Sequence, residues 1–521
     1  MHSVAIMRHS FLTFTAVVLL TLTSCGNSAS DSETLPPADS LEVSVTESDS
    51  IPSLPQLRFS LPSGIYRSSD SLSVAIDAGG LRIRYTLDGS LPGPNSALYS
   101  EPILITHNTV IRAYAHDDST DFHTDTATAT YILDTPHSIP VLSLSLDPSD
   151  FYSHHSGIYA DGPGYTAAFP HTGANYWKHW IRQAHAELFN DSLGGFQSCC
   201  GLKIFGGTSR AEAKKSFCLK FKKQYGSSGV TYDFFATGHK IKLKDLVLRA
   251  GGQDWNRAML RDEFFTSLMA PHCPTLLTQA YRPVALYVNA EYFGLYYLRE
   301  KIDRRFVARH LGVSPDSVTI ITSGLYTEEG SMAEFRQLMR YVNTHDMRNS
   351  LHYSYVREHI DLQGLIDYKL GEIYSCNTDI GNYRMVYSPD PRGDRKWHFV
   401  FYDLDATWVA YIPAQKYLTA TGHDPIMGNL GLHNRLIARL LANPDFRALM
   451  QQRIDYHLAH TFSEQNATRV FDRLVSAIRP EMPLNCRRWP QLSYESWEKH
   501  IADFRQRFSK AAGSIDGCVV L

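Results

Sequence analysis

The sequence Asn377-Thr378-Asp379-Ile380-Gly381-Asn382 is followed, across a predicted hairpin, by Tyr402-Asp403-Leu404-Asp405. Residues 383–387 and 397–402 have strand-like apolar patterns, and the segment 388–394 between them is rich in the turn formers Pro, Gly and Asp. In such a hairpin the start of the first strand lies beside the end of the second. The sequence therefore predicts that Asp379 and Asn382 meet Asp403 and Asp405 in space.

These carboxylates stand at the edges of apolar strands, where packing alone gives little reason for a charged group. An Asp, an Asn three residues later and an Asp at the end of the adjoining strand can hold a base and Mg²⁺ in enzymes that transfer phosphoryl groups. The alternative is that the Asp and Asn side chains only cap or turn the ends of the hairpin. The local sequence leaves both interpretations open.

Length and composition bound the class of protein. The chain has 521 residues, which is long for one domain, so two or more domains are expected. A hydrophobic content of 43% and a charged content of 20% are ordinary for a globular protein with a substantial core. The net charge of -3 and the pI near 6.8 give no sign of the basic surface that binds nucleic acid. We therefore expect no nucleic-acid partner.

The N-terminus has the features of an export signal. Arg8 precedes an apolar run over 11–22 that is too short to span a membrane as a mature helix. The run ends in Leu22-Thr23-Ser24-Cys25-Gly26, which resembles a bacterial lipobox, in which the Cys is lipidated and becomes the new N-terminus. This resemblance implies a signal peptide at 1–24, a membrane anchor at Cys25 and a location in the bacterial cell envelope, at the outer membrane or cell surface. The alternative is an ordinary secretory signal with a chance Cys.

Two segments of different composition follow the signal. Residues 25–56 are rich in Ser, Asp, Thr, Glu and Pro, which is typical of a flexible tether. Between 57 and 135, short alternating runs separated by turns predict a small β-sandwich. Tyr85-Thr86-Leu87-Asp88-Gly89-Ser90-Leu91-Pro92, with Ile111-Arg112-Ala113-Tyr114-Ala115 further on, resembles the C-terminal type of module of chitobiases and hexosaminidases. The resemblance implies an immunoglobulin-like sandwich that serves as an accessory module.

The remainder, 137–521, is divided by its patterns into a β-rich half at about 139–299 and a helical half at about 300–521. A hairpin is expected over 285–298. Apolar residues at helical spacing predict helices at 257–269, 331–342, 361–374, 434–441 and 445–457. The acidic hairpin falls within the helical half. We therefore predict the α+β class, with two lobes and a cleft between them.

Four blocks of this remainder occur in a specific order: Gly206-Gly207-Thr208-Ser209-Arg210 with Lys214-Lys215-Ser216-Phe217; Leu248-Arg249 through Asp254-Trp255 to Arg261-Asp262; Val288-Asn289 to Glu300-Lys301-Ile302-Asp303; and 377–405. In these blocks the chain resembles the CotH family, the spore-coat-type atypical protein kinases. The resemblance implies a kinase-like fold, ATP with Mg²⁺ or Mn²⁺ as cofactors, and transfer to Ser-type hydroxyls. Asn289-Ala290 departs from the Asn-Gly turn usual in the family, and Tyr402 stands where Trp is common, but neither change removes an acid.

Site roles follow from the resemblance residue by residue. It places Asp379 on the catalytic-loop Asp and Asn382 on the partner that can reach a metal. Asp403 falls on the metal-binding Asp, with Asp405 beside it. The chemistry agrees, because phosphoryl transfer requires a metal across the phosphates and an acceptor for the hydroxyl proton.

The nucleotide-binding residues are less sharply defined. Lys215 lies on a strand pattern and is the candidate for contacting phosphate, with Lys214 as its competitor. Arg210 either clamps a phosphate or pairs with an acid. Glu300 follows a strand and either lines the cleft or caps the next segment. The segment 261–263, Arg-Asp-Glu, holds candidates for the acid that positions the lysine, although a structural ion pair explains these residues equally well.

Three functions remain in competition. The first is an envelope-anchored atypical protein kinase that transfers the γ-phosphate of ATP to Ser/Thr-type hydroxyls of an envelope protein. The second is a catalytically inactive surface adhesin or carbohydrate-associated lipoprotein that uses the kinase-like fold as a scaffold. Transfer of a nucleotidyl group is a third alternative, because the same residues can hold ATP reversed. Asp379, Asn382, Asp403 and a lysine on a strand pattern favour an enzyme, whereas the scarcity of ATP outside the cytoplasm argues against one.

Overall fold

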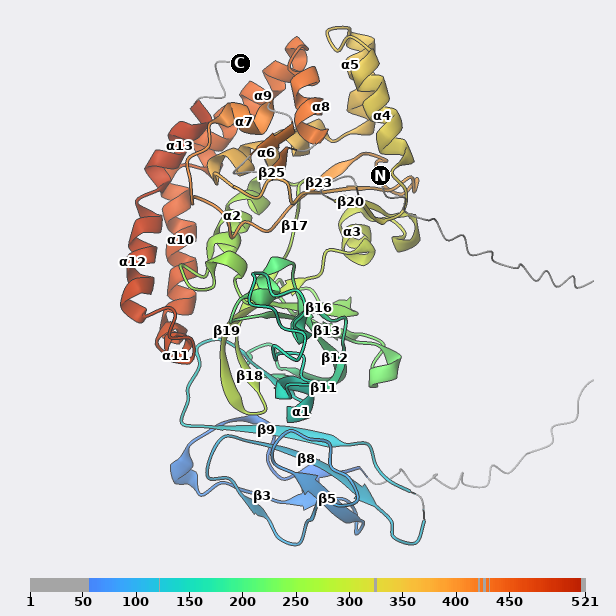
Figure 1. The fold of residues 1–521 in the computed structure, drawn as a ribbon, viewed down its shortest axis with the longest axis vertical. Coiled ribbons are helices and arrows are strands. Elements are labelled where there is room, and N and C mark those ends of the chain that lie inside the picture. The colour runs from blue at the N-terminus through green and yellow to red at the C-terminus, as the bar shows by residue number, and fades with distance from the viewer. Residues whose placement is uncertain are drawn as a thin grey trace, which may run out of the picture. The chain divides into compact units, whose positions relative to one another are not determined.

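The computed structural model describes residues 56–120, 122–322, 326–419, 422–424, 428–430 and 432–516 (Figure 1). The expected signal peptide, the anchor at Cys25 and nearly all of the expected tether lie outside the described residues. Within the described residues, no helix combines the length and the apolar character needed to cross a membrane.

The first part of the described chain is a β-sandwich, as the alternating runs predicted. Its largest sheet has five strands in the order β2-β9-β8-β5-β6, and the pairs β1-β4 and β3-β7 complete it. Val74, Ile111 and Tyr131 are fully buried in its core. The strands are β1 (Arg58–Phe59), β2 (Gly64–Tyr66), β3 (Ser73–Val74), β4 (Ile76–Asp77), β5 (Arg82–Thr86), β6 (Ala97–Leu98), β7 (Ile103–Leu104), β8 (Thr109–His116) and β9 (Ala127–Leu133).

Seven of the strands that follow close into a barrel in the order β10-β11-β12-β13-β16-β19-β18, with β10 and β18 parallel. The hairpin expected over 285–298 is confirmed, because β18 and β19 pair antiparallel. Asn289 and Ala290 both have positive φ, 49° and 63°, as a tight hairpin turn requires. The barrel strands are β10 (Val141–Ser145), β11 (Arg182–Phe189), β12 (Phe196–Phe205), β13 (Ser216–Lys220), β16 (Asp245–Arg249), β18 (Tyr281–Val288) and β19 (Glu291–Glu300).

A second sheet contains the acidic hairpin. Its order is β17 (Leu277–Thr278), β23 (His398–Phe401), β22 (Arg384–Tyr387), β20 (Thr319–Thr322) and β21 (Tyr326–Glu329). Strands β22 and β23 are antiparallel, with Arg384 opposite Val400. The predicted hairpin is therefore present, and the loop before β22 lies beside the loop after β23.

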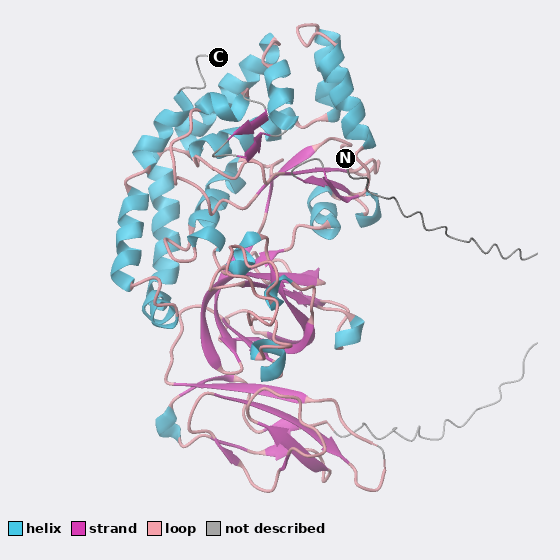
Figure 2. Ribbon diagram, viewed as in Figure 1, coloured by secondary structure: helices cyan, strands magenta, loops and turns pink. Residues whose placement is uncertain are grey.

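Helices dominate the part of the chain after the barrel (Figure 2). The predicted helices are confirmed, with shifts of a few residues at their ends that are usual for helix boundaries. Helix α6 is buried along nearly its whole length and lies in the largest core. The longer helices are α2 (Arg261–Met269), α3 (Arg304–Leu311), α4 (Ala333–Thr344), α5 (Ser350–His359), α6 (Leu362–Tyr374), α8 (Leu432–Leu440), α9 (Pro444–Tyr456), α10 (Glu464–Ile478), α11 (Met482–Arg488), α12 (Tyr494–Arg505) and α13 (Phe508–Asp516).

A buried carboxylate joins the sandwich to the barrel. Glu187 on β11 accepts hydrogen bonds from Ser63 Oγ at 2.6 Å and from Thr130 Oγ1 at 2.7 Å. Only 4% of Glu187 is exposed, and this burial raises the pKa of its carboxyl group to about 7. The contact therefore depends on a group that titrates near neutral pH.

Candidate active site

A cleft of about 430 Å³ lies between the barrel and the second sheet. The barrel contributes the end of β12 with the loop that follows it, together with side chains of β16 and β19. The second sheet contributes β22 and the loops that flank the acidic hairpin. The structure thus brings the four predicted polar residues to one cleft: Asp379, Asn382, Asp403 and Asp405.

Asn382 and Asp403 are in direct contact across the hairpin. Asn382 Nδ2 donates to Asp403 Oδ2 at 2.5 Å, and the Tyr402 hydroxyl donates to Asn382 Oδ1 at 2.8 Å. Asp403 has a φ of 61°, a left-handed conformation that Asp tolerates better than most residues. This backbone turn comes two residues after the end of β23, so the carboxylate lies just past the edge of the sheet.

Asp379 is held in a short turn just before β22. Its backbone N–H donates to Asn377 Oδ1 at 3.0 Å, and its carbonyl oxygen accepts from the Asn382 N–H at 3.0 Å. Burial, and then the negative charge of Asp403, raise the pKa of the Asp379 carboxyl group to about 6. The backbone contacts hold the turn, and the Asn382 side chain is a hydrogen-bond partner of the Asp379 carboxylate.

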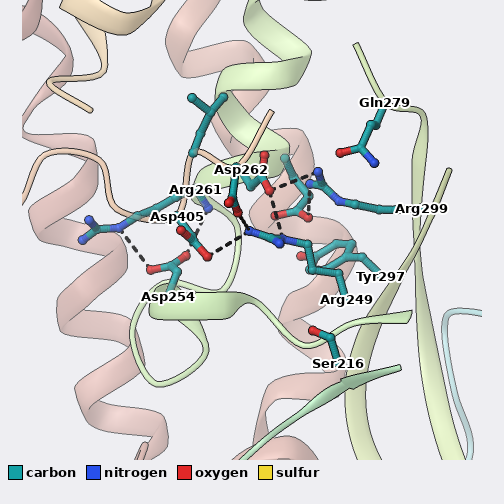
Figure 3. A network of polar contacts seen from close by, with 12 residues as sticks. Ser216, Arg249, Asp254, Arg261, Asp262, Gln279, Tyr297, Arg299 and Asp405 are labelled. Carbon is teal, nitrogen blue, oxygen red and sulfur yellow. Dashed lines mark hydrogen bonds and ion pairs between the residues drawn. The ribbon is translucent and has the colours of Figure 1, made fainter. Parts of the chain in front are cut away.

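Arg249, at the end of β16, connects the barrel to the acids of the hairpin (Figure 3). Its Nη2 lies 2.6 Å from Asp403 Oδ1 and 2.9 Å from Asp405 Oδ2. Its Nε lies 3.0 Å from Asp262 Oδ2 on α2. One guanidinium group therefore contacts three acids from two parts of the chain, α2 and the segment after β23.

Arg299 on β19 extends this network deeper into the protein (Figure 3). Its Nη1 lies 3.1 Å from Asp262 Oδ2, and its Nη2 lies 2.6 Å from Glu263 Oε1. Asp262 and Glu263 therefore position arginines rather than the lysine expected from the sequence. Arg261 has a structural role, because its Nε lies 3.0 Å from the buried Asp254.

On the acidic side of the cleft, the carboxyl groups of Asp403 and Asp405 contact Arg249, and Asp379 lines the same cleft. Burial, and then the charge of Asp403, raise the pKa of the Asp405 carboxyl group to about 8. Carboxylate and amide oxygens are the ligands that Mg²⁺ prefers. The donor set therefore fits a hard divalent cation.

The opposite wall of the cleft is basic. Lys203, Arg210 and Lys301 line it together with the Gly206-Gly207 loop. The side chain of Lys203 forms no hydrogen bond or ion pair with any residue in the described part of the chain, whereas Arg210 Nε donates to the Gly206 carbonyl oxygen at 2.6 Å. Lys301 is 3.8 Å from Asp303. Lysine and arginine side chains beside a glycine loop suit the phosphates of a nucleotide.

Two residues predicted to bind nucleotide lie outside this cleft. Lys215 is turned to the Glu212 carbonyl oxygen, 2.7 Å from its Nζ, and lies 4.0 Å from the centre of the Tyr176 ring. Glu300 accepts from Arg309 Nη2 at 2.8 Å and from the Ala280 N–H at 3.1 Å. Lys214 is also buried, and its Nζ donates to the Leu295 carbonyl oxygen at 2.6 Å. The structure therefore does not support Lys215 or Glu300 as nucleotide contacts.

Strand alternation explains the position of Glu300 at the end of β19, whereas Lys215 lies just before β13. Side chains of successive strand residues point to opposite faces, so Arg299 and Lys301 reach the cleft while Glu300 points away. The same alternation places Lys203 and Phe205 of β12 on the cleft side. Sequence reasoning missed Lys203, although its spacing of two from Phe205, next to the Gly206-Gly207 loop, was a usable signal.

A second group of potential metal ligands lies elsewhere. Among the described residues, Cys273, Asp367 and His457 place their ligand atoms within 4.8 Å of one another and are buried. Asp367 Oδ1, however, already accepts from Arg453 Nε at 2.7 Å and lies 2.9 Å from His457 Nε2. The charge of Asp367 is balanced by Arg453, so this group is a structural polar network.

Comparisons with known families agree with both resemblances. The profile of the chitobiase/beta-hexosaminidase C-terminal domain matches residues 61–128, within the sandwich. The profile described as CotH kinase protein matches residues 202–510, which include every acid of the cleft. Curated proteins gave no match. Because the second match spans more than half of the chain, the protein belongs to the CotH kinase protein family.

Proposed function

We propose that this protein is a metal-dependent kinase that transfers the γ-phosphate of ATP to Ser/Thr-type hydroxyls of an envelope protein, on a two-lobed, kinase-like fold. The observation that carries the proposal is the meeting of Asp379, Asn382 and Asp403 in one cleft that also has a basic, glycine-containing wall. Membership of the CotH kinase protein family supports it.

Asp403 and Asn382 are the residues that would hold Mg²⁺ or Mn²⁺. A divalent ion there supplies charge neutralisation across the phosphates. The Asn382 amide presents its Nδ2 to Asp403, so offering its oxygen to a cation requires a half-turn of the amide. The Tyr402 hydroxyl can donate or accept, and it therefore remains a partner for the turned amide.

Asp379 is the residue that would orient the acceptor hydroxyl and take its proton. It lines the same cleft but has no contact with Arg249 or Arg299 among the ion pairs of the described residues. A carboxylate that is not neutralised by an arginine remains available as a base. Lys203, Arg210 and Lys301 would contact the phosphates.

The Cys25 lipid anchor is the part of the proposal that concerns location. The lipobox-like sequence supports it, and more than one acyl chain on that residue is needed for firm anchoring. The expected result is that Cys25→Ala releases the protein from the membrane fraction. Retention of the variant on membranes after a salt wash would contradict the anchor.

Intact-mass spectrometry tests the activity. The purified chain and a Ser/Thr-containing protein fraction from the same envelope are incubated with ATP and Mg²⁺ or Mn²⁺, with Asp379→Asn as the control. A gain of phosphate that the control lacks supports the kinase. A gain of a nucleotidyl group instead shows that ATP binds reversed, and the absence of both modification and nucleotide binding leaves the inactive surface protein as the function.

A further inference from the structure

We propose that Arg249 takes the place of a second metal ion, so that this site binds a single divalent ion, held by Asp403 and Asn382. This inference rests on the proposed function and specifies the metal content of the same cleft. It assigns Arg249 a positioning role that the sequence did not indicate.

The position of Arg249 Nη2 is the first argument. This one nitrogen lies 2.6 Å from Asp403 Oδ1 and 2.9 Å from Asp405 Oδ2. It thus bridges two carboxylates, as the second ion of a two-metal site would. A guanidinium group stays charged at every physiological pH, so the positive charge at this position is permanent.

The packing of Asp405 is the second argument. Its Oδ2 also accepts from the Gln253 N–H at 3.0 Å. A Cβ placed on Gly252 would lie only 1.6 Å from the same oxygen, so the carboxylate fills the space that the missing side chain leaves. With its Oδ2 held by Arg249 and Gln253, Asp405 is an anchor for the arginine rather than the metal ligand predicted from the sequence.

The third argument is that Arg249 is also paired through its Nε. Its Nε lies 3.0 Å from Asp262 Oδ2, and Asp262 is itself fixed by Arg299 at 3.1 Å. The guanidinium group is therefore paired with acids through its Nε as well as through its Nη2. Asp403 Oδ2, the oxygen that faces Asn382, is the one left for a cation.

Mn²⁺ binding measures the metal content directly. Free Mn²⁺ is titrated by electron paramagnetic resonance in the presence of saturating, non-hydrolysable AMP-PNP. The wild-type chain is expected to bind one Mn²⁺. Arg249→Gln is expected to bind two, because it frees Asp403 Oδ1 and Asp405 Oδ2 for a second ion. Arg384→Gln is the matched control, since Arg384 lines the cleft but pairs with Glu328 at 3.0 Å, and it is expected to bind one.

The outcomes separate this inference from the proposed function. Two Mn²⁺ ions in the wild type would overturn the inference and leave the kinase proposal intact. One Mn²⁺ in a folded Arg249→Gln would likewise overturn it. If Arg249→Gln does not fold, as judged by circular dichroism, the wild-type stoichiometry decides alone. The absence of any nucleotide-dependent Mn²⁺ in the wild type would overturn the proposed function and this inference together.

Discussion

Replacing Asp379 with Asn should separate nucleotide binding from phosphoryl transfer. The substitution keeps the size and shape of the side chain but removes its ability to accept a proton. The turn around residue 379 is held by the Asn377 Oδ1 contact and by the Asn382 N–H, both of which involve the Asp379 backbone. The loop geometry should therefore survive.

The size of the effect follows from the role of the side chain. Loss of a general base lowers a rate by about two to four orders of magnitude. This corresponds to about 3–5 kcal/mol of activation free energy. Binding of Mg²⁺-ATP should remain close to wild type, because the proposed metal ligands Asp403 and Asn382 are unchanged. Asp403→Asn should behave oppositely, since it removes the charge that holds the metal.

Two assays on the same preparations distinguish the variants. Titration calorimetry with and without Mg²⁺ gives the metal-dependent part of ATP affinity, and quench-flow or mass spectrometry gives the transfer rate. Asp379→Asn should lose the rate and keep the affinity, whereas Asp403→Asn should lose the metal-dependent affinity. Unchanged metal-dependent affinity in both variants would refute the assignment of this hairpin as the metal and nucleotide site.

Three further predictions use the wider structure. Lys203→Met should weaken ATP binding by about ten-fold or more in calorimetry, as loss of a charged phosphate contact does. Lys215→Met should bind ATP normally in the same assay. The reverse result would restore Lys215 as the phosphate contact. The folded-state pKa of Glu187 is raised from 4.5 to about 7, so folding stability should fall as the pH rises from 4.5 to 7. Glu187→Gln should remove that fall and gain up to about 3 kcal/mol at pH 8 in urea denaturation; an unchanged pH profile would contradict this origin. Burial lowers the pKa of His398, but its contacts with Asp361 and Asp394 outweigh burial and raise the pKa from 6.5 to about 9. The stabilisation by His398 should therefore be complete below pH 6.5 and lost as the pH rises through 9. His398→Gln should flatten the pH dependence of the melting temperature over that range, and an unaltered profile would assign the effect to another group.

Local patterns were enough to predict the hairpin and the meeting of its polar ends. Strand alternation and a turn-forming segment define an antiparallel pair, so the proximity of Asp379 and Asp403 follows from residues close in sequence. The side of a strand on which a residue lies is harder to predict. Glu300 was placed on the cleft because its strand was recognised but the phase of the alternation was not, and Lys215 lies just before β13 rather than within the expected strand.

The role of Arg249 could not be derived from local sequence. Its partners Asp403 and Asp405 are 154 and 156 residues away, and they meet it only because the barrel and the second sheet enclose one cleft. Closure of the barrel depends equally on a distant pair, since β10 and β18 are parallel neighbours. Such long-range pairing leaves no periodic signal in a single sequence.

The metal and nucleotide site is tested most directly by crystals grown with Mn²⁺ and AMP-PNP. Anomalous scattering locates manganese without reference to any assumed ligand. The account predicts one peak in the cleft, coordinated by Asp403 and Asn382, with the nucleotide phosphates toward Lys203 and the Gly206-Gly207 loop. Manganese and nucleotide bound elsewhere, or a cleft that stays empty while AMP-PNP is saturating, would contradict it.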